Sequence, residues 1–402
     1  MTSYMPFDTA GMDRIRPAWL EVDLDCLAWN MRQVKAAAGA GVRICASVKS
    51  NAYGHGCAAV AGVLLENGAD RLSVAILDEA LELRRLGIVA PVLILGALEY
   101  ARARDVAVHG FAQTISSIDE ARALSEASKA PGTRAAVHIK IDTGMGRLGF
   151  QYDDPDIYEK ILASCALPGL YAEGIFTHFA ASDEADAAFT HLQLRRFTRA
   201  CEVLSGMGRT FAIRHCSNSA AISGFPEASL DMVRPGIALY GGAGGPEGPH
   251  HADMRLRRVL SLRATITLVK RVKAGDPVGY GRRFIAQRDA IIATIPIGYA
   301  DGYSRGLSCG KGAALINGRR APIAGTVCMD QCMADVTDAG RVNAGDEAVL
   351  YGRQGGGEIT LEEVSRTLDT IPYELMCAIS RRVPRVYIKN GKPAGAVNYL
   401  VP

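Results

Sequence analysis

The first 240 residues alternate short apolar, β-rich runs with helical patterns, and this alternation constrains the fold more than any other feature. Helical start and stop signals separate most of the runs, and they predict helices over residues 25–39 and 78–87. Ser117 and Glu120 have the spacing of a capping box ahead of a further helix. Eight strands alternating with helices predict an α/β fold, a parallel (β/α)8 TIM-type barrel. The eight runs are VRICASV, LSVAI, PVLIL, AQTI, AVHIKID, AEGIFTHF, AIRHCSN and RPGIALYG.

An open doubly wound sheet is the alternative for this half, although it needs a topological switch that the sequence does not display. The pattern changes at GGAGGPEGPH, residues 241–250, which has no period and is interpreted as a linker. Beyond it, SLRATITLVKRV alternates with period two, and further short β-rich runs follow. Two helices are predicted, over residues 361–368 and near residues 373–379. We therefore expect a barrel domain over residues 1–245 and a mostly-β domain over residues 246–402.

Charge and hydropathy exclude several classes of protein. The 45 basic and 42 acidic residues give a formal charge of +3, too balanced to indicate a nucleic-acid or membrane-surface partner. No apolar run reaches the roughly 20 residues of a membrane helix, and the N-terminal segment has no signal-peptide core. The ten cysteines are scattered and form no C-x-x-C pair. We expect mostly reduced core thiols in a cytoplasmic protein and no metal site; a thiol-metal site is the minor alternative.

Lys49 follows the first predicted strand, in the stretch VRICASVKSNAYGHG. Active sites of parallel barrels lie at the C-terminal ends of the strands, and a partly desolvated lysine there can attack carbonyls or form a Schiff base. On position alone, a structural lysine that reaches water or pairs with a carboxylate is the commoner case. We expect His55 in the following loop to hold the turn rather than transfer protons.

Further polar residues gather at other predicted strand ends. In HIKIDTGMGRLGF, alternation places His138, Lys140 and Asp142 on one face, where they must be paired if the strand is buried. The two glycines after them frame a turn that presents Arg147. His178 on GIFTHF is more often a hydrogen-bonded core residue, and its functional option is to stack on a flat ligand.

Two loops have the character of a phosphate site. HCSNSAAIS and RPGIALYG follow the seventh and eighth predicted strands, and loops at these places of a barrel frequently bind phosphate. No Walker pattern occurs, so the phosphate would belong to a cofactor. A strand-end lysine together with such a site suggests pyridoxal phosphate. In the β-rich half, Tyr280 lies between glycines and precedes two arginines, which can make it an acid or base; a tyrosine with its hydroxyl in water is the alternative.

Nine stretches together resemble the ordered motifs of alanine racemases, pyridoxal-phosphate enzymes with a (β/α)8 barrel and a C-terminal β domain. The resemblance extends from Trp19 to Val386. It implies an isomerase that interconverts L- and D-alanine, the latter a peptidoglycan precursor. The stretches are SVKSNAYGHG, HIKIDTGMGRLGF, THFAASDEAD, CSNSAA, RPGIALYG, VGYGRR, IPIGYADGY, VCMDQC and IPYEL with RVPR.

The resemblance also implies roles for single residues. Lys49 would link covalently to the cofactor, His178 would pack against its pyridine ring, and Arg234 would face the ring nitrogen. Arg147 would reach the ring hydroxyl and the substrate. The positions that match the family's phosphate contacts are Tyr53, Asn218, Ser219, Gly236 and Ile237.

In this family the second base comes from the partner subunit of a head-to-tail homodimer, and Tyr280 matches it. Met329 would contact the substrate carboxylate through its amide, and Tyr299 would line the entrance. Lys140 matches a position that is carbamylated in some members. The chain departs from the pattern at Arg381, where some members have a tyrosine that touches the phosphate and braces the catalytic tyrosine.

Three other functions are compatible with parts of this pattern. A racemase for larger amino acids such as serine, lysine or arginine shares the motifs. A pyridoxal-phosphate decarboxylase shares the architecture, but the Tyr280 and VCMDQC contexts argue against it. A non-enzymatic pyridoxal-phosphate-binding protein would have the barrel without a second domain.

Overall fold

The computed structural model describes residues 15–130, 132–242 and 254–401, which form two compact units. The described residues within Leu27–Ala52 and Val60–Arg257 form the barrel unit, and the described residues within Met1–Cys26, Tyr53–Ala59 and Arg258–Pro402 form the β unit. The predicted linker lies outside the described residues from residue 243 onward. The predicted division into residues 1–245 and 246–402 therefore stays a prediction.

The barrel unit contains a near-closed ring of parallel strands, so the barrel prediction is confirmed. The ring closes where Met232 pairs with Arg43, while the Asp231 amide donates to Arg214 O over 3.1 Å and the Arg234 amide donates to Ser217 O over 2.9 Å. An open sheet is thereby excluded. In ring order the strands are β10 (Met232–Val233), β2 (Arg43–Ser47), β3 (Arg71–Val74), β4 (Val92–Ile94), β5 (Ala112–Ile115), β6 (Ala135–Asp142), β8 (Leu170–Phe176) and β9 (Ile213–His215), and β7 (Phe150–Gln151) pairs with β6.

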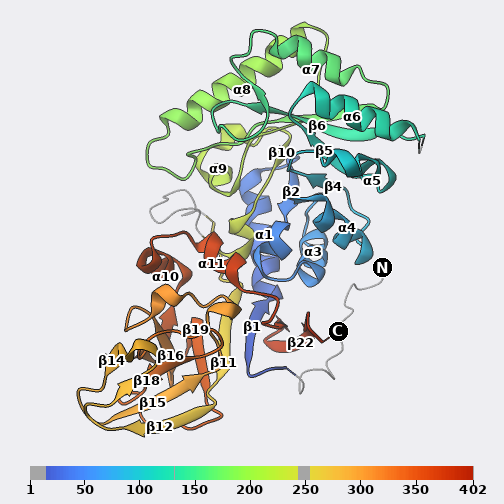
Figure 1. Cartoon of the computed structure of the whole chain (residues 1–402). Helices are drawn as coiled ribbons and strands as arrows, with labels where there is room; N and C mark the ends of the chain where they lie inside the picture. The colour runs from blue at the N-terminus through green and yellow to red at the C-terminus, as the bar shows by residue number, and fades with distance from the viewer. Residues whose placement is uncertain (1–14, 131, 243–253, 402) are drawn as a thin grey trace. The chain divides into compact units, whose positions relative to one another are not determined.

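Helices connect these strands, and Figure 1 shows α4 to α8 on their outside. The predicted cap at Ser117 is present, since its hydroxyl accepts the Glu120 amide over 3.2 Å. The Glu120 carboxylate accepts the Ser116 amide instead of completing the box. Within the described residues, no helix combines the length and apolar character that crossing a membrane requires. The helices are α1 (Leu24–Ala38), α2 (Lys49–Tyr53), α3 (Cys57–Glu66), α4 (Leu77–Arg85), α5 (Ala103–Val108), α6 (Ile118–Lys129), α7 (Ile157–Cys165), α8 (Ala188–Gly206) and α9 (Ser219–Gly224).

The eighth strand differs from the prediction. RPGIALYG was expected to form it, but β10 ends at Val233 and Ile237–Tyr240 form a 3-10 turn, η4. Pro235 has no N–H for a strand ladder, and Gly236 leaves the extended region with φ −120° and ψ −98°. This turn lets the amides of Gly236 and Ala238 donate to the Ser219 hydroxyl oxygen.

The β unit is built from antiparallel pairs and one parallel pair. SLRATITLVKRV, which alternates with period two, contains two strands, β11 (Leu260–Thr265) and β12 (Leu268–Val272), and these strands pair in different sheets. The main sheet has the order β17 (Arg319–Pro322), β16 (Ala313–Ile316), β19 (Glu347–Gln354), β11, β1 (Ala18–Asp23), β21 (Arg385–Lys389) and β22 (Lys392–Val397). The remaining strands are β13 (Pro277–Val278), β14 (Phe284–Ile285), β15 (Ala290–Ile295), β18 (Cys332–Asp335) and β20 (Gly357–Ile359), and the helices are α10 (Leu361–Leu368) and α11 (Pro372–Ala378).

Candidate active site

Lys49 lies two residues after the end of strand β2, near the strand end as predicted, and is half-buried. The chain then makes a left-handed turn, in which Ser50, Asn51 and Ala52 have φ of 52°, 54° and 54°. Left-handed backbone costs about 1–2 kcal/mol for each such residue, and strain of this kind is held in place at functional sites by the surroundings. Here the Ser50 amide donates to the carboxylate of Glu79. The turn therefore gives the segment after Lys49 a defined direction.

The loop after this turn belongs to the β unit. Arg385 is buried and its Nε donates to Gly54 O over 2.8 Å, while the Tyr387 hydroxyl donates to His55 O over 3.3 Å. The His55 ring bonds to Tyr53 O through Nδ1 at 2.9 Å, in agreement with its predicted role in the turn. Gly54 has φ +79°, and a Cβ there would overlap a backbone carbonyl, so the position requires glycine.

Asp142 organises the turn that carries Arg147. Its Oδ1 accepts the amides of Gly144, Met145 and Gly146 at 2.9, 2.8 and 3.1 Å, and its Oδ2 accepts the Arg147 amide at 3.1 Å. Four backbone donors on one carboxylate leave it little capacity for proton transfer. Asp142 is therefore a structural anchor that presents Arg147 at the end of β6.

Lys140 lies on β6, two residues before Asp142, and is only 3% exposed. Its Nζ lies 5.6 Å from the centroid of the Phe176 ring. Burial is the main cause that lowers the pKa of Lys140 from 10.5 to about 8, and the charges of Arg147 and Arg234 add to the effect. A sizeable fraction of this amine is therefore neutral near pH 8.

Helix α8 holds the segment that contains His178. Gln193 on this helix donates to His178 O over 3.0 Å, and its Oε1 accepts the Ala180 amide over 2.8 Å. Burial is the largest cause that keeps the pKa of His178 well below its usual value, so its ring is neutral. The cations that add to this effect are Arg234, Arg147, Lys140 and Lys49.

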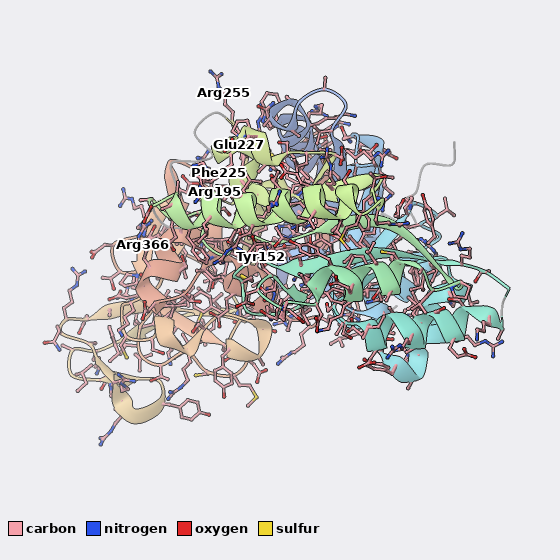
Figure 2. All side chains as sticks on the ribbon, turned by 90° about the horizontal axis from the view of Figure 1, so that it is seen from above. Tyr152, Arg195, Phe225, Glu227, Arg255 and Arg366 are labelled. Carbon is pink, nitrogen blue, oxygen red and sulfur yellow. The ribbon has the colours of Figure 1, made fainter. Side chains whose placement is uncertain are left out.

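Other contacts fix α8 itself. Arg196 donates to Thr143 O over 2.8 Å, and its guanidinium lies 5.3 Å from the centroid of the Tyr152 ring. On the same helix, the His191 ring packs edge-on against Phe225 with centroids 5.2 Å apart. Figure 2 shows Phe225 beside α8. These contacts give His178 a rigid support, which the sequence did not predict because they join distant segments.

Arg234 is almost fully buried and is held from several sides. Its Nη1 donates to His215 Nδ1 over 2.7 Å, and its Nη2 donates to Thr177 O over 2.8 Å and Cys216 O over 3.2 Å. Burial lowers the pKa of Arg234 to about 10, so it remains a cation at neutral pH. Within the described part of the chain, no protein acceptor meets its Nε–H.

Ser219 and Asn218 begin helix α9. The Asn218 side chain caps the helix by accepting the Ala221 amide over 3.0 Å. The Ser219 hydroxyl oxygen accepts the amides of Gly236 and Ala238 at 2.8 and 3.3 Å. Its O–H remains a donor. The Gly236 amide, one of the predicted phosphate contacts, is already used by the Ser219 oxygen.

Three predicted residues meet in the β unit. Tyr280, Tyr299 and Met329 line an open hollow of about 610 Å³. Tyr280 is 74% exposed, and its carbonyl accepts the Thr326 hydroxyl over 3.1 Å. Among the described residues, no protein acceptor meets the amide of Met329, although its carbonyl accepts the Ala300 amide. An exposed phenol and an available amide thus lie around one hollow.

The barrel unit contains the predicted cations and the loops of the predicted phosphate site. The β unit contains Tyr53 and the three residues around the hollow, Tyr280, Tyr299 and Met329. Four cations act on His178, which suits an anionic ligand with a phosphate and a ring hydroxyl. The Nε–H of Arg234 suits a ring nitrogen that accepts a hydrogen bond. The residues present therefore fit pyridoxal phosphate.

Arg381, the departure from the family pattern, lies with its guanidinium carbon 5.1 Å from the centroid of the Tyr399 ring.

Comparisons with known proteins agree with this geometry. Residues 22–244 match the family model of the alanine racemase N-terminal domain, and residues 259–387 match that of the C-terminal domain. The chain is 45% identical over 386 residues to the alanine racemase of Clostridium tetani, which covers 96% of this chain and 99% of that protein.

Solved structures extend the similarity to the fold. An alanine racemase of Clostridium difficile 630 has a TM-score of 0.91 and 37% identity, with coverage of 96% of this chain and 99% of that one. A histidine racemase from Leuconostoc mesenteroides subsp. sake has a TM-score of 0.84 and 31% identity, with coverage of 93% and 98%.

Proposed function

The chain belongs to the alanine racemase family, and on that premise we propose that its barrel residues bind pyridoxal phosphate and that Lys49 and Tyr280 are the two bases. The activity is that of an alanine racemase, an isomerase that acts on an amino acid, and the family depends on pyridoxal phosphate. The single observation that supports the cofactor site best is Arg234, a buried cation with an available Nε–H.

When bound, pyridoxal phosphate makes the α-proton of a covalently attached amino acid acidic. Lys49 takes or returns this proton on one face and Tyr280 does so on the other, so the configuration inverts. Arg234 keeps its own proton and offers a hydrogen bond to the ring nitrogen, which limits side reactions such as transamination. Arg147, presented by Asp142, would contact the ring hydroxyl and the substrate, and His178 would pack on the ring.

The phosphate is proposed to bind at the start of α9 and in the η4 turn. The Met329 amide is proposed to bind the substrate carboxylate, and Tyr299 to line the entrance. The proposed phosphate contacts are Tyr53, Asn218, Ser219, Gly236 and Ile237. The Ser219 hydroxyl, which already accepts two amides of this turn, supports the assignment.

A homodimer with shared sites completes this proposal. A second copy of the chain supplies Tyr280, which is supported by its 74% exposure on the hollow that Met329 also lines. Lys140 is proposed to carry a carbamate, since carbamylation requires a neutral amine and its pKa is lowered to about 8. We place the reaction in the cytoplasm.

A broader amino-acid preference is the second candidate. It is supported by Arg381 in place of the bracing tyrosine, and by the histidine racemase that shares this fold. The test incubates the pure protein with a panel of L-amino acids and follows optical activity and CO2 release. Alanine should lose optical activity fastest. Faster loss with serine, lysine or arginine supports the second candidate, and CO2 release contradicts racemisation.

A separate experiment tests the covalent anchor. Borohydride reduction of the loaded protein followed by peptide mapping should place the reduced cofactor on Lys49. Lys129, an exposed lysine of α6, is the matched control and should carry no label. A label on any lysine other than Lys49 overturns the assignment.

A further inference from the structure

A chain of hydrogen bonds leads from Arg234 through two histidines to Glu173. Arg234 Nη1 lies 2.7 Å from His215 Nδ1, His215 Nε2 lies 2.8 Å from His138 Nδ1, and His138 Nε2 lies 2.9 Å from a Glu173 oxygen. Both histidines are fully buried. Arg71 binds both oxygens of Glu173 at 2.9 Å and lies 3.2 Å from His138 Nε2.

The end groups determine where each histidine carries its proton. A guanidinium only donates, so His215 Nδ1 accepts and its proton lies on Nε2. His215 Nε2–H then donates to His138 Nδ1, which places the His138 proton on Nε2. That N–H donates to the Glu173 carboxylate, which only accepts. Every contact of the chain is satisfied with both histidines neutral.

The opposite arrangement leaves two donors facing each other. If His138 Nε2 accepted from Arg71, its Nδ1–H would donate to His215 Nε2. The His215 proton would then lie on Nδ1 and point at Arg234 Nη1 only 2.7 Å away. The conflict at Arg234 therefore excludes this arrangement, and Arg71 makes its hydrogen bonds to the two oxygens of Glu173.

Charge states agree with the first arrangement. Burial is the largest cause that lowers the pKa of His138 and holds that of His215 well below its usual value, so both rings are neutral. Burial alone would raise the pKa of Glu173, but hydrogen bonds from His138 and Arg71 hold it below its usual value. Glu173 is therefore a carboxylate and can only accept.

The backbone around Glu173 is shaped for this contact. Strands β6 and β8 pair Val137 with Ala172 and His138 with Gly174, so Glu173 is the extra residue of a β-bulge. Bulges re-aim side chains. A Cβ at Gly174 would overlap the His138 ring, so glycine makes room for the histidine.

We propose that Glu173 is a positioning residue that acts through the fixed tautomers of His138 and His215 to hold Arg234 in place as a donor. Its effect on the cofactor rests on the proposed function, in which Arg234 faces the ring nitrogen. The tautomers themselves do not depend on a cofactor. The two parts can therefore be tested separately.

Histidine tautomers are measured by long-range ¹H–¹⁵N correlation on the full-length protein with labelled histidine, with and without pyridoxal phosphate. The signals of His138 and His215 are assigned with single His→Gln variants. Both rings should be neutral with the proton on Nε2 in both samples. A proton on Nδ1 of either ring, or a doubly protonated ring, overturns the proposal, whatever the enzyme catalyses.

Two substitutions then isolate Glu173. Glu173→Leu removes the acceptor of His138 Nε2–H and leaves Arg71 as a donor beside it. The single tautomer should therefore be lost, and rings with the proton on Nδ1 should appear. Glu173→Gln keeps an accepting oxygen and should keep both protons on Nε2. Unchanged tautomers in Glu173→Leu overturn the proposal, and the wild-type measurement stands if that variant does not fold.

A matched control and a second readout complete the test. Asp231→Asn removes another carboxylate that binds an arginine, Arg214, without touching the histidines, and it should leave both tautomers unchanged. In loaded enzyme, Glu173→Leu should raise the ratio of transamination to racemisation, and Glu173→Gln should restore it. A ratio that stays at the wild-type value in Glu173→Leu overturns the link from Glu173 to the ring nitrogen while the tautomer result stands.

Discussion

Arg234 Nη1 donates to His215 Nδ1 over 2.7 Å, and this contact joins a buried cation to a neutral ring. Because the pKa of Arg234 is about 10, it stays charged at the pH of catalysis. A cation that keeps its proton can donate to a ring nitrogen without protonating it. Side reactions should therefore be sensitive to this residue.

Arg234→Glu should raise transamination and reduce racemisation, because a carboxylic acid can transfer a proton to the ring nitrogen. Loss of one preorganised donor costs on the order of 10²-fold in kcat. Pyruvate formation from alanine measures transamination, and chiral chromatography measures racemisation. Arg214→Gln is the control, since Arg214 pairs with Asp231 outside the site. Unchanged pyruvate formation would contradict the role of Arg234.

Tyr280→Phe should abolish racemisation but retain exchange of the α-proton of one enantiomer with solvent. The remaining base, Lys49, still acts on one face, while the phenyl ring has no proton to give on the other. Exchange in D2O is followed by NMR for L- and D-alanine separately. Tyr171→Phe, at an exposed tyrosine of β8, should behave as wild type. Equal exchange of both enantiomers in Tyr280→Phe would show that another residue is the second base.

Lys140 gives a pH-dependent prediction. Its pKa is about 8 in the folded chain and about 10.5 when unfolded, so between these values the unfolded chain binds more protons. In the absence of CO2, the free energy of unfolding should therefore rise with pH across this window by about 3 kcal/mol relative to Lys140→Met. Urea unfolding at several pH values measures the difference. A flat difference would mean that the amine is not desolvated.

Bicarbonate should change this result by converting Lys140 to a carbamate. With ¹³C-bicarbonate, the wild-type protein should show a carbamate carbonyl signal that Lys140→Met lacks. Lys129→Met is the control and should keep the signal, because Lys129 is exposed. A wild-type spectrum without a carbamate signal would remove the carbamylation proposal.

Gly54→Ala should destabilise the loop that carries Tyr53. The position has φ +79°, and the Cβ of an alanine there would overlap Met376 O. Backbone strain and the steric clash therefore both lower the stability of the variant. A loss of about 2 kcal/mol or more is expected, together with weaker binding of pyridoxal phosphate. Gly110→Ala is the matched control, since Gly110 has φ +63° with nothing within 4 Å of the Cβ. It should cost about 1 kcal/mol and leave cofactor binding unchanged. Equal effects of the two changes would contradict the packing argument.

Local patterns determined much of this protein from its sequence. Strand and helix periods are set by neighbouring residues, so the barrel and the helix starting at Ser117 could be predicted. Lys49 could be placed at a strand end for the same reason. The glycines at positions 54 and 56 indicated the loop that follows it. The family motifs added Tyr280, which position alone did not distinguish from a surface tyrosine.

Tertiary structure decided what depends on distant partners. Asp142 was predicted as one of three paired ionisable groups, and the turn showed that it binds four backbone amides. Strand β1 pairs with β11 and β21, more than 200 residues away in the chain. Arg71 and Glu173 are 102 residues apart, yet they end the hydrogen-bond chain to Arg234. Such contacts have no local signal, because closing the barrel is what brings their donors and acceptors within hydrogen-bonding distance.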